Sequence, residues 1–419
     1  MRDLVILAIV YGSLPIILFR PFYGLMVYSW LAFMRPQDMA WGISRVSPLS
    51  QYVAIAMILG LVLSVGRERL MTLKPQTVLL ILLAAWISLS TALAVVPEMA
   101  MDVYGNYWKA ILMTVLITGL VRGGARFDDG PGGFMSDNNS FALALNMVLP
   151  LLVGLAIVEK QKIVRLAAAG AAALCMLCIL FTFSRGGLLT LALVGGLLIW
   201  RSRQRFVVGS LLAIGLCGFL LFSSEDLTQQ YVERASSISN YEEDGSAQGR
   251  LNAWATSWRV FLDYPVTGVG PNNLAAVFMR YSPDNDRFRV AHNAYFQLLA
   301  ECGLPALLLF LAAIGATFWR LQRLRNLTTQ PWVEVQARMF QIALAAYLLG
   351  SMFLNTAYSE LIYYLMGLSV GLEVVAESAA SEEATPAAAS PSTSTPWWKR
   401  PAPRRAGSPA ATPGWTGGV

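Results

Sequence analysis

The chain has 419 residues, of which 56% are hydrophobic and 13% are charged, and its formal net charge is +6. A soluble domain carries about 25% charged residues, so this composition excludes an ordinary soluble enzyme. Nucleic-acid binding does not account for the positive charge, because the Lys and Arg residues lie in short loops between apolar runs, as the positive-inside rule expects of a membrane protein.

Apolar runs recur along the whole chain, and a hydrocarbon core of about 30 Å needs roughly 20 apolar residues per helix. We therefore predict an all-α, polytopic membrane protein of about twelve transmembrane helices. The first run resembles a signal peptide, but no small-residue cleavage site follows Phe19, so we expect it to remain as a membrane helix. The expected spans are approximately 4–19, 22–34, 49–65, 76–96, 108–121, 140–158, 164–183, 186–200, 206–222, 293–319, 338–356 and 359–376.

These runs divide the chain into five parts. They are N-terminal membrane helices (1–122), central membrane helices with an Asp-Asn-Asn segment and a turn at Arg185 (123–222), a long outward loop with short amphipathic helices (223–292), C-terminal membrane helices (293–376) and a tail (377–419). The tail is rich in Ala, Pro, Ser and Thr and is expected to be disordered and cytoplasmic.

Basic loops predict the orientation of the second half of the chain. Three of them are expected to be cytoplasmic, namely Lys160/Lys162/Arg165, Arg201/Arg203/Arg205 and Arg320/Arg323/Arg325. The alternate loops, which are Ser184-Arg185-Gly186, segment 223–292 and the turn at 355–359, then face outward.

The first half does not agree with this count. Counting backward places Arg67/Arg69/Lys74 outside and the Glu98/Asp102 loop inside, which reverses the usual charge bias. One more crossing between Arg122 and Asp137 would remove the conflict, but segment 123–134 is Gly-rich and polar and is not expected to span.

The outward loop is the longest polar stretch between spans, and such loops are usually functional or disordered. A helix is predicted from Arg250, because apolar residues recur at helical spacing opposite Asn252, Ser257 and Arg259. The apolar residues are Leu251, Trp254, Trp258, Phe261 and Leu262. Two tryptophans suit a helix in the membrane interface. A second short helix is expected at about 273–281.

Some patterns in the chain have a structural explanation beside a chemical one. Cys175 and Cys178 lie inside an apolar run and are interpreted as core residues in preference to a redox or metal motif. Asp284 and Asp286 resemble an Asp-x-Asp metal motif, but Pro, Asp and Asn favour a turn there. Gly268-Val-Gly270-Pro271 is interpreted as a turn and not as a nucleotide-binding fingerprint.

The only histidine, His292, follows the basic residues Arg280, Arg287 and Arg289 and leads into an apolar run. Neutral imidazole can act as a general base near neutral pH, while a histidine at this place could equally be structural. If a helix begins near Arg287, Arg289 and His292 share one face. Glu301 would then be half a turn out of phase and is not expected to orient His292.

Arg185 and Arg250 are the other candidate residues. An arginine at the membrane edge suggests a functional site, and its planar fork of donors matches phosphate oxygens. Snorkelling to the outer headgroups is the structural alternative for Arg185, and a lipid-surface contact is the alternative for Arg250. A Ser-His-Asp hydrolase is a poor fit, because the chain has no Gly-x-Ser-x-Gly motif.

Three motifs resemble those of the bacterial O-antigen ligase and polymerase superfamily. They are Thr182-Phe-Ser-Arg185-Gly-Gly, then Gly249-Arg250-Leu-Asn-Ala-Trp254 leading to Pro265-x-x-Gly268-x-Gly270, and His292-Asn-Ala-Tyr-Phe-Gln-Leu-Leu-Ala-Glu301-x-Gly303. Arg35-Pro-Gln-Asp-Met-Ala-Trp-Gly and Gly132-Gly-Phe-Met-Ser-Asp137-Asn-Asn further resemble the exosortase-associated O-glycosylation ligases. Members of that subgroup have another membrane helix before the Asp-Asn-Asn segment, which this sequence lacks.

The resemblance implies a metal-independent, inverting glycosyl transfer without a cofactor, in the bacterial inner membrane with the site facing the periplasm. The implied donor is a polysaccharide on undecaprenyl diphosphate, and the implied acceptor is the lipid A-core oligosaccharide. His292 would deprotonate the acceptor hydroxyl, Arg185 and Arg250 would hold the diphosphate, and Arg289, Asn293 and Arg280 are possible supporting residues. A polymerase, a protein O-oligosaccharyltransferase and a lipid-linked oligosaccharide transporter stay open as alternatives. The sequence does not predict the oligomeric state.

Overall fold

The computed structural model describes residues 2–34, 36, 42–63, 73–120, 138–182, 184–201, 245–282 and 288–384, and every regular element in these residues is a helix. The helices are α1 (Arg2–Phe19), α2 (Pro21–Met34), α3 (Ile43–Val46), α4 (Leu49–Leu63), α5 (Pro75–Ala92), α6 (Pro97–Leu120), α7 (Asn138–Val158), α8 (Lys162–Phe181), α9 (Arg185–Arg201), α12 (Gly245–Asp263), α13 (Leu274–Tyr281), α14 (Ala294–Leu327), α15 (Pro331–Gly350), the 3-10 turn η3 (Ser351–Phe353) and α16 (Glu360–Ala384). The prediction of an all-α fold is confirmed for this part of the chain.

Each predicted span coincides with one of these helices, apart from 206–222, which lies outside the described residues. By length and composition, five described helices could cross a membrane, namely α5, α7, α8, α14 and α16 as far as Ala380. The helices α1, α4 and α9 are apolar but shorter. The total of about twelve spans stays a prediction.

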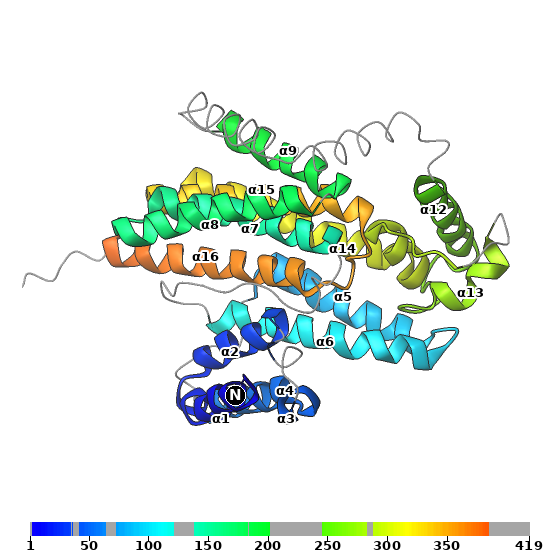
Figure 1. Ribbon diagram of the computed structural model, residues 1–419, viewed down its shortest axis with the longest axis horizontal. Coiled ribbons are helices and arrows are strands. Elements are labelled where there is room, and N and C mark those ends of the chain that lie inside the picture. The colour runs from blue at the N-terminus through cyan, green and yellow to red at the C-terminus, as the bar shows by residue number, and fades with distance from the viewer. Residues whose placement is uncertain are drawn as a thin grey trace, which may run out of the picture. The chain divides into compact units, whose positions relative to one another are not determined.

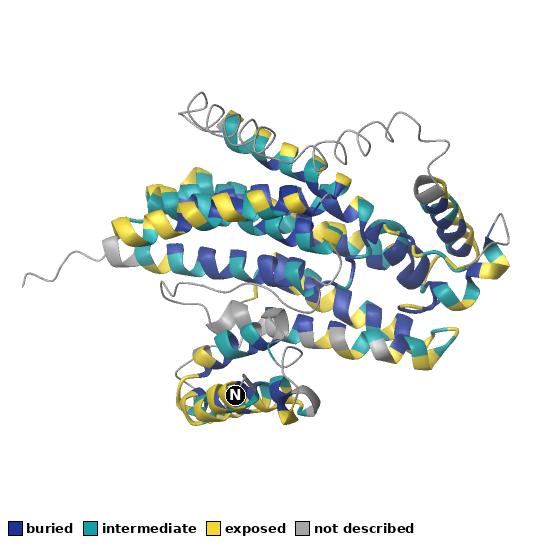
Figure 2. Cartoon of the chain, in the orientation of Figure 1, coloured by how far each residue is buried: buried dark blue, intermediate teal, exposed yellow. Residues whose placement is uncertain are grey.

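Long apolar side chains lie exposed on several of these helices, as a bilayer environment requires. On α8, Ile163, Leu166 and Leu174 are 83%, 71% and 61% exposed, and most of the helix is open to its surroundings (Figure 2). Soluble proteins rarely expose apolar surface of this extent, so these faces are suited to lipid.

The main core forms around α14, with α5, α7, α15 and α16 packed together in Figure 1. Phe310 of α14 makes edge-to-face contacts with Tyr347 of α15 and Tyr363 of α16, at centroid distances of 6.2 and 6.3 Å. A smaller apolar cluster joins α1, α2 and α4. The surrounding acyl chains are as apolar as this core, so the hydrophobic effect does not drive the helices together. Such contacts stabilise helix association in lipid through close van der Waals packing.

One end of this bundle is held together by charge, and we call it the Arg320 end. The guanidinium of Arg320 donates to both carboxylate oxygens of Glu373 on α16, from Nε to Oε1 at 3.2 Å and from Nη2 to Oε2 at 2.7 Å. Nζ of Lys74, directly before α5, lies 3.8 Å from the same carboxylate. Glu373 is 2% exposed, so its charge is balanced by these two cations.

The opposite end contains His292, and we call it the His292 end. The loop between α5 and α6 reaches it, since the N–H of Val95 donates to the carbonyl of Val269 at 2.8 Å and the N–H of Val96 donates to Asn273 Oδ1 at 2.5 Å. The start of α7 lies there too. Its Asn139 accepts a hydrogen bond from Ser184 at 2.6 Å, and Gly186 lies against Phe353, close in the chain to Asn355, which accepts from the N–H of Asn293.

These contacts bear on the conflict between the span count and the charge bias in the first half. Lys74 lies at the same end as the basic Arg320, and the loop before Glu98 lies at the His292 end, which agrees with the charge bias and not with the count of crossings. Helix α6 runs away from the His292 end, and α7 begins at that end. Residues 121–137 themselves lie outside the described part.

Helix α14 is broken at Gly303, which has φ +77° and ψ 179°. The carbonyls freed by the break accept hydrogen bonds from other segments: Ala300 from the N–H of Val269, Glu301 from the N–H of Gly270 and Cys302 from Nε1 of Trp86. The N–H of Leu304 donates to the carbonyl of Pro265. Lipid offers no hydrogen-bond partners, so these contacts supply the partners that the freed backbone groups need. They also hold the loop 265–273 against the broken helix.

We expect Gly303→Ala to destabilise the protein by about 1–3 kcal/mol, because this backbone region is almost exclusive to glycine and a Cβ would overlap the carbonyl of Val266. Gly315→Ala is the matched control, since it lies in the same helix with no atom within 4 Å of its Cβ position. Thermal unfolding of the detergent-solubilised protein measures both. Equal melting temperatures for the two variants would contradict the assigned break.

The outward-loop helices are present, with one correction. Helices α12 and α13 match the predicted positions, but α12 turns a different face inward. Ser257, expected on the polar side, is fully buried with Ala253, Thr256 and Val260. Its hydroxyl donates to the carbonyl of Ala253, so a small polar residue can be buried where α12 packs closely.

The exposed face of α12 is also apolar. It presents Leu251, Trp258 and Leu262, which are 39%, 48% and 59% exposed. This face fits the predicted position in the membrane interface, which stays a prediction.

The tail is a second correction. Disorder was expected from residue 377, but α16 continues to Ala384 through the alanine-rich, helix-favouring sequence Glu-Ser-Ala-Ala-Ser-Glu-Glu-Ala. The rest of the tail, like the Asp284/Asp286 pair and the first part of the outward loop, lies outside the described residues.

Candidate active site

Arg185 is the first residue of α9, and its side chain is exposed. Ser184 caps the helix, because its Oγ accepts a hydrogen bond from the N–H of Gly187 at 3.0 Å. The Ser184 hydroxyl also donates to Asn139 of α7. The predicted turn is thus built as a capped helix start that carries an exposed arginine.

The two glycines after Arg185 allow close packing of this helix start. A Cβ at Gly187 would come within 2.6 Å of the Ala142 Cβ on α7, and one at Gly186 would lie 3.3 Å from the Phe353 Cβ in η3. The beginning of α9 is therefore seated between α7 and η3, which fixes the position of the Arg185 backbone.

His292 lies in a non-helical segment just before α14 and is exposed. Its φ is +45°, in the left-handed region that costs a non-glycine residue about 1–3 kcal/mol and is common at functional sites. The next residue, Asn293, is buried and caps α14, because its side-chain oxygen accepts from the N–H groups of Tyr295 and Phe296. The capping explains why the helix begins where it does.

The expected helical face shared by Arg289 and His292 is wrong. Helix α14 begins at Ala294, after both residues, because Asn293 is its cap. Arg289 instead lies against α12: a Cβ at Gly249 would overlap Nη1 of Arg289 and lie 3.0 Å from its Cδ. Glycine at 249, the residue before Arg250, therefore leaves room for the Arg289 side chain against α12.

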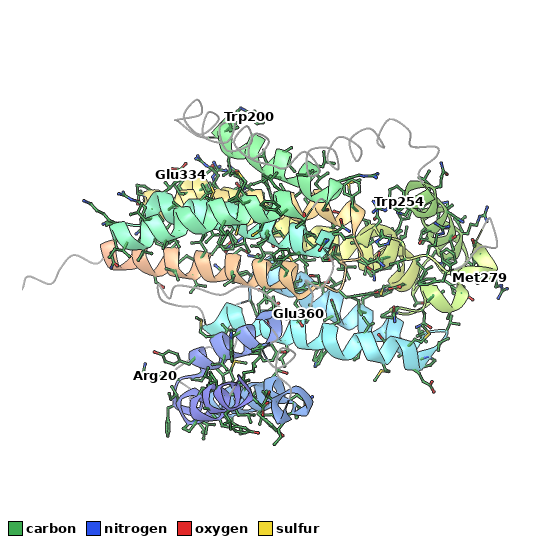
Figure 3. All side chains as sticks on the ribbon, in the orientation of Figure 1. Arg20, Trp200, Trp254, Met279, Glu334 and Glu360 are labelled. Carbon is green, nitrogen blue, oxygen red and sulfur yellow. The ribbon has the colours of Figure 1, made fainter. Side chains whose placement is uncertain are left out.

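Trp254 lies on α12 (Figure 3). It connects this helix to the residue before His292. Its Nε1–H donates to the carbonyl of Ala291 at 2.7 Å, and its ring stacks on Phe296 of α14 with centroids 5.6 Å apart and planes at 15°. Arg250 and Trp254 are four residues apart on α12, so they share the face that meets this segment.

A second connection runs from His292 toward Arg185. The N–H of Asn293 donates to Oδ1 of Asn355 at 3.2 Å. Asn355 follows Phe353, which packs against Gly186. The Tyr295 hydroxyl donates to the carbonyl of Leu348 at 2.7 Å and accepts from Ser351 at 3.0 Å, which holds the start of α14 against the end of α15.

Arg185, Arg250 and His292 thus come from three elements to one end of the bundle. The O-antigen ligase family model matches residues 169–311, which include all three. Over these residues the chain is similar to the O-antigen ligase family, and this match supports membership of the O-antigen ligase superfamily. A family of unknown function, DUF5935, matches residues 1–129. No curated protein matches the chain.

Membership in this superfamily gives the general kind of activity. Its members are glycosyltransferase-like ligases and polymerases, and it implies lipid-linked polysaccharide substrates in the membrane. Together with the long apolar helices, it identifies the chain as a membrane protein. The exosortase-associated subgroup stays a prediction.

Of the remaining candidate residues, Arg280 lies on α13, and Asp284 and Asp286 lie outside the described residues. Arg280 is exposed on the last turn of α13, with its Cζ 5.8 Å from the ring centroid of Tyr281. The Asp263 carboxylate accepts a hydrogen bond from the Tyr281 hydroxyl and raises the pKa of Tyr281 to about 12. Within the described residues no group of three or more His, Cys, Asp or Glu side chains could hold a metal ion.

Glu301 acts away from His292, as the sequence indicated. Its side chain is 4% exposed, and its carboxylate accepts a hydrogen bond from the Tyr358 hydroxyl at 2.8 Å. The carboxylate also forms hydrogen bonds with the backbone of Asn272 and Leu274, at the start of α13. This carboxylate joins α14 to the outward loop and to the turn before α16.

The sequence did not reveal that Trp254 and Asn355 contact the residues on either side of His292. Trp254 was assigned to the interface, although its spacing from Arg250 could have indicated a shared face. Asn355 was recognised only as part of a turn. No sequence signal relates it to Asn293, because the contact joins segments far apart in the chain.

Proposed function

We propose that this protein is an O-antigen ligase of the bacterial inner membrane. It transfers a polysaccharide from undecaprenyl diphosphate to the lipid A-core oligosaccharide, with inversion, without a metal and on the periplasmic side. The observation that supports this best is the meeting of Arg185 from α9, Arg250 from α12 and His292 before α14 at one end, through the contacts of Trp254 and Asn355.

The arginines would bind the donor diphosphate. A guanidinium offers two parallel donors to phosphate oxygens, and Arg185 adds its charge to the positive end of the α9 dipole. Neutralised in this way, the diphosphate can accept the electron pair of the breaking bond between the anomeric carbon and oxygen. A separate general acid is then unnecessary, because the diphosphate leaves without a proton.

His292 would act on the acceptor. The imidazole takes the proton of a core-sugar hydroxyl while that oxygen attacks the anomeric carbon from the face opposite the diphosphate. Attack on the opposite face inverts the anomeric configuration. The exposed position of His292 allows a large acceptor sugar to approach it. Arg289, Asn293 and Arg280 are proposed only as supporting residues.

Transfer by the purified protein, given lipid-linked polysaccharide and lipid A-core, tests the proposal. We expect polysaccharide on lipid A-core and release of undecaprenyl diphosphate. A ladder of longer glycans on the donor lipid, with none on lipid A, would instead identify a polymerase. Labelled envelope proteins in place of lipid A would indicate a protein acceptor, and movement of the donor across liposomes without any new bond would indicate a transporter.

Chelation tests the metal-free part of the proposal. We expect the transfer rate to be unchanged in excess EDTA, because two arginine forks supply the charge that a divalent ion would supply. Loss of activity in EDTA with recovery on adding Mg²⁺ or Mn²⁺ would contradict this expectation. Asp284→Asn and Asp286→Asn would then be the first variants to examine.

A further inference from the structure

The backbone of His292 is fixed on both of its sides by side chains from other elements. Before it, the carbonyl of Ala291 accepts a hydrogen bond from Trp254 Nε1 at 2.7 Å. After it, the N–H of Asn293 donates to Asn355 Oδ1 at 3.2 Å. The peptide planes that flank His292 are therefore both held, and these planes determine its φ and ψ.

These two hydrogen bonds explain why His292 adopts a backbone conformation that it would not favour on its own. The φ of +45° at His292 lies in the left-handed region, where residues other than glycine persist only when their surroundings determine them. Asn293 extends the restraint by capping α14 with its side chain, so the segment cannot join the helix. The direction of the Cα–Cβ bond, and with it the reach of the imidazole, is set by these contacts.

The same two contacts relate His292 to each arginine. Trp254 is one turn from Arg250 on α12, and Asn355 is two residues from Phe353, which packs against Gly186 beside Arg185. The Trp254 contact therefore links the His292 backbone to the helix that carries Arg250, and the Asn355 contact links it to the helix start that carries Arg185.

We infer that Trp254 and Asn355 are positioning residues, which hold His292 in its left-handed conformation and fix its place relative to Arg250 and Arg185. The inference rests on the proposed function for its effect on catalysis, but the restraint on His292 can be measured without activity. A misplacement of a catalytic group by about 1 Å can lower a rate by roughly 10²-fold.

The variants separate hydrogen bonding from packing. Trp254→Phe removes the indole N–H and keeps an aromatic ring to stack on Phe296. Trp258→Phe makes the same chemical change on the exposed face of α12 and is the matched control. Asn355→Leu removes the acceptor at similar size.

Two measurements decide the inference. We expect Trp254→Phe and Asn355→Leu to lower kcat by about tenfold to a hundredfold with the donor KM unchanged, whereas Trp258→Phe keeps kcat near that of the original protein. Because His292 is the only histidine, protein purified through a histidine-free tag and labelled with ¹⁵N-histidine gives one side-chain NMR signal. That signal should shift or broaden in the two damaging variants alone.

An unchanged histidine signal in Trp254→Phe and Asn355→Leu would overturn the restraint itself. A changed signal with unchanged kcat would overturn its role in transfer. If His292→Ala retains transfer, the base assignment fails, and the NMR comparison still decides whether the two residues hold His292.

Discussion

Replacing His292 with alanine lowers the rate of glycan transfer by about 10²–10⁴-fold, the contribution typical of a general base. The side chain is exposed, so its removal should leave folding and donor binding close to normal. The measurement is single-turnover transfer with saturating lipid-linked donor, together with the thermal melting of the purified variant.

His292→Asn is the matched variant for this prediction. Asparagine tolerates the left-handed backbone region better than alanine does, so it retains the conformation of the segment without supplying a base near neutral pH. Equal loss in both variants assigns the effect to the imidazole. Transfer at the original rate in either of them would contradict the role of His292.

Replacing Arg185 or Arg250 with alanine lowers transfer by about 10²–10³-fold, as expected when one group that stabilises developing charge is removed. Lysine retains the charge but not the fork, so Arg185→Lys and Arg250→Lys should remain clearly impaired. The donor KM should rise as well, in contrast to the His292 variants. Rates measured over a series of donor concentrations separate the two effects.

Arg165→Lys is the control for the arginine variants, because Arg165 is exposed on α8 among the basic residues expected in the cytoplasm. Its transfer rate should equal that of the original protein. If Arg185→Lys and Arg250→Lys matched this control, the arginines would act through charge alone or not at all, and the bidentate contact with the diphosphate would be wrong.

Helices and the three motif residues could be predicted from the sequence because both signals are local. Apolar runs of sufficient length become helices in lipid, where every backbone group must be satisfied within the segment. The break at Gly303 could not be predicted in this way. Its positive φ depends on hydrogen bonds from Trp86 and the 265–273 loop, which are distant in sequence.

The topology of the first half shows a different limit. Counting spans passes any missed crossing on to every loop before it, so the count and the charge bias disagreed over Lys74. The contact of Lys74 with Glu373, which also binds Arg320, agrees with the charge bias. The face of α12 was misassigned because small residues such as Ala253 and Ser257 give little hydropathy signal, yet they allow the closest packing. Contacts between distant segments, such as Asn293 with Asn355, leave no trace in a single sequence.

A structure of the protein with undecaprenyl diphosphate bound tests the convergence of the three residues most directly. The arrangement predicts that the diphosphate lies within hydrogen-bond distance of the guanidinium groups of both Arg185 and Arg250, with the His292 imidazole facing the space where the anomeric carbon would stand. A diphosphate bound elsewhere, for example beside Arg320 at the other end of the bundle, or a His292 turned away from it, would contradict the proposed site.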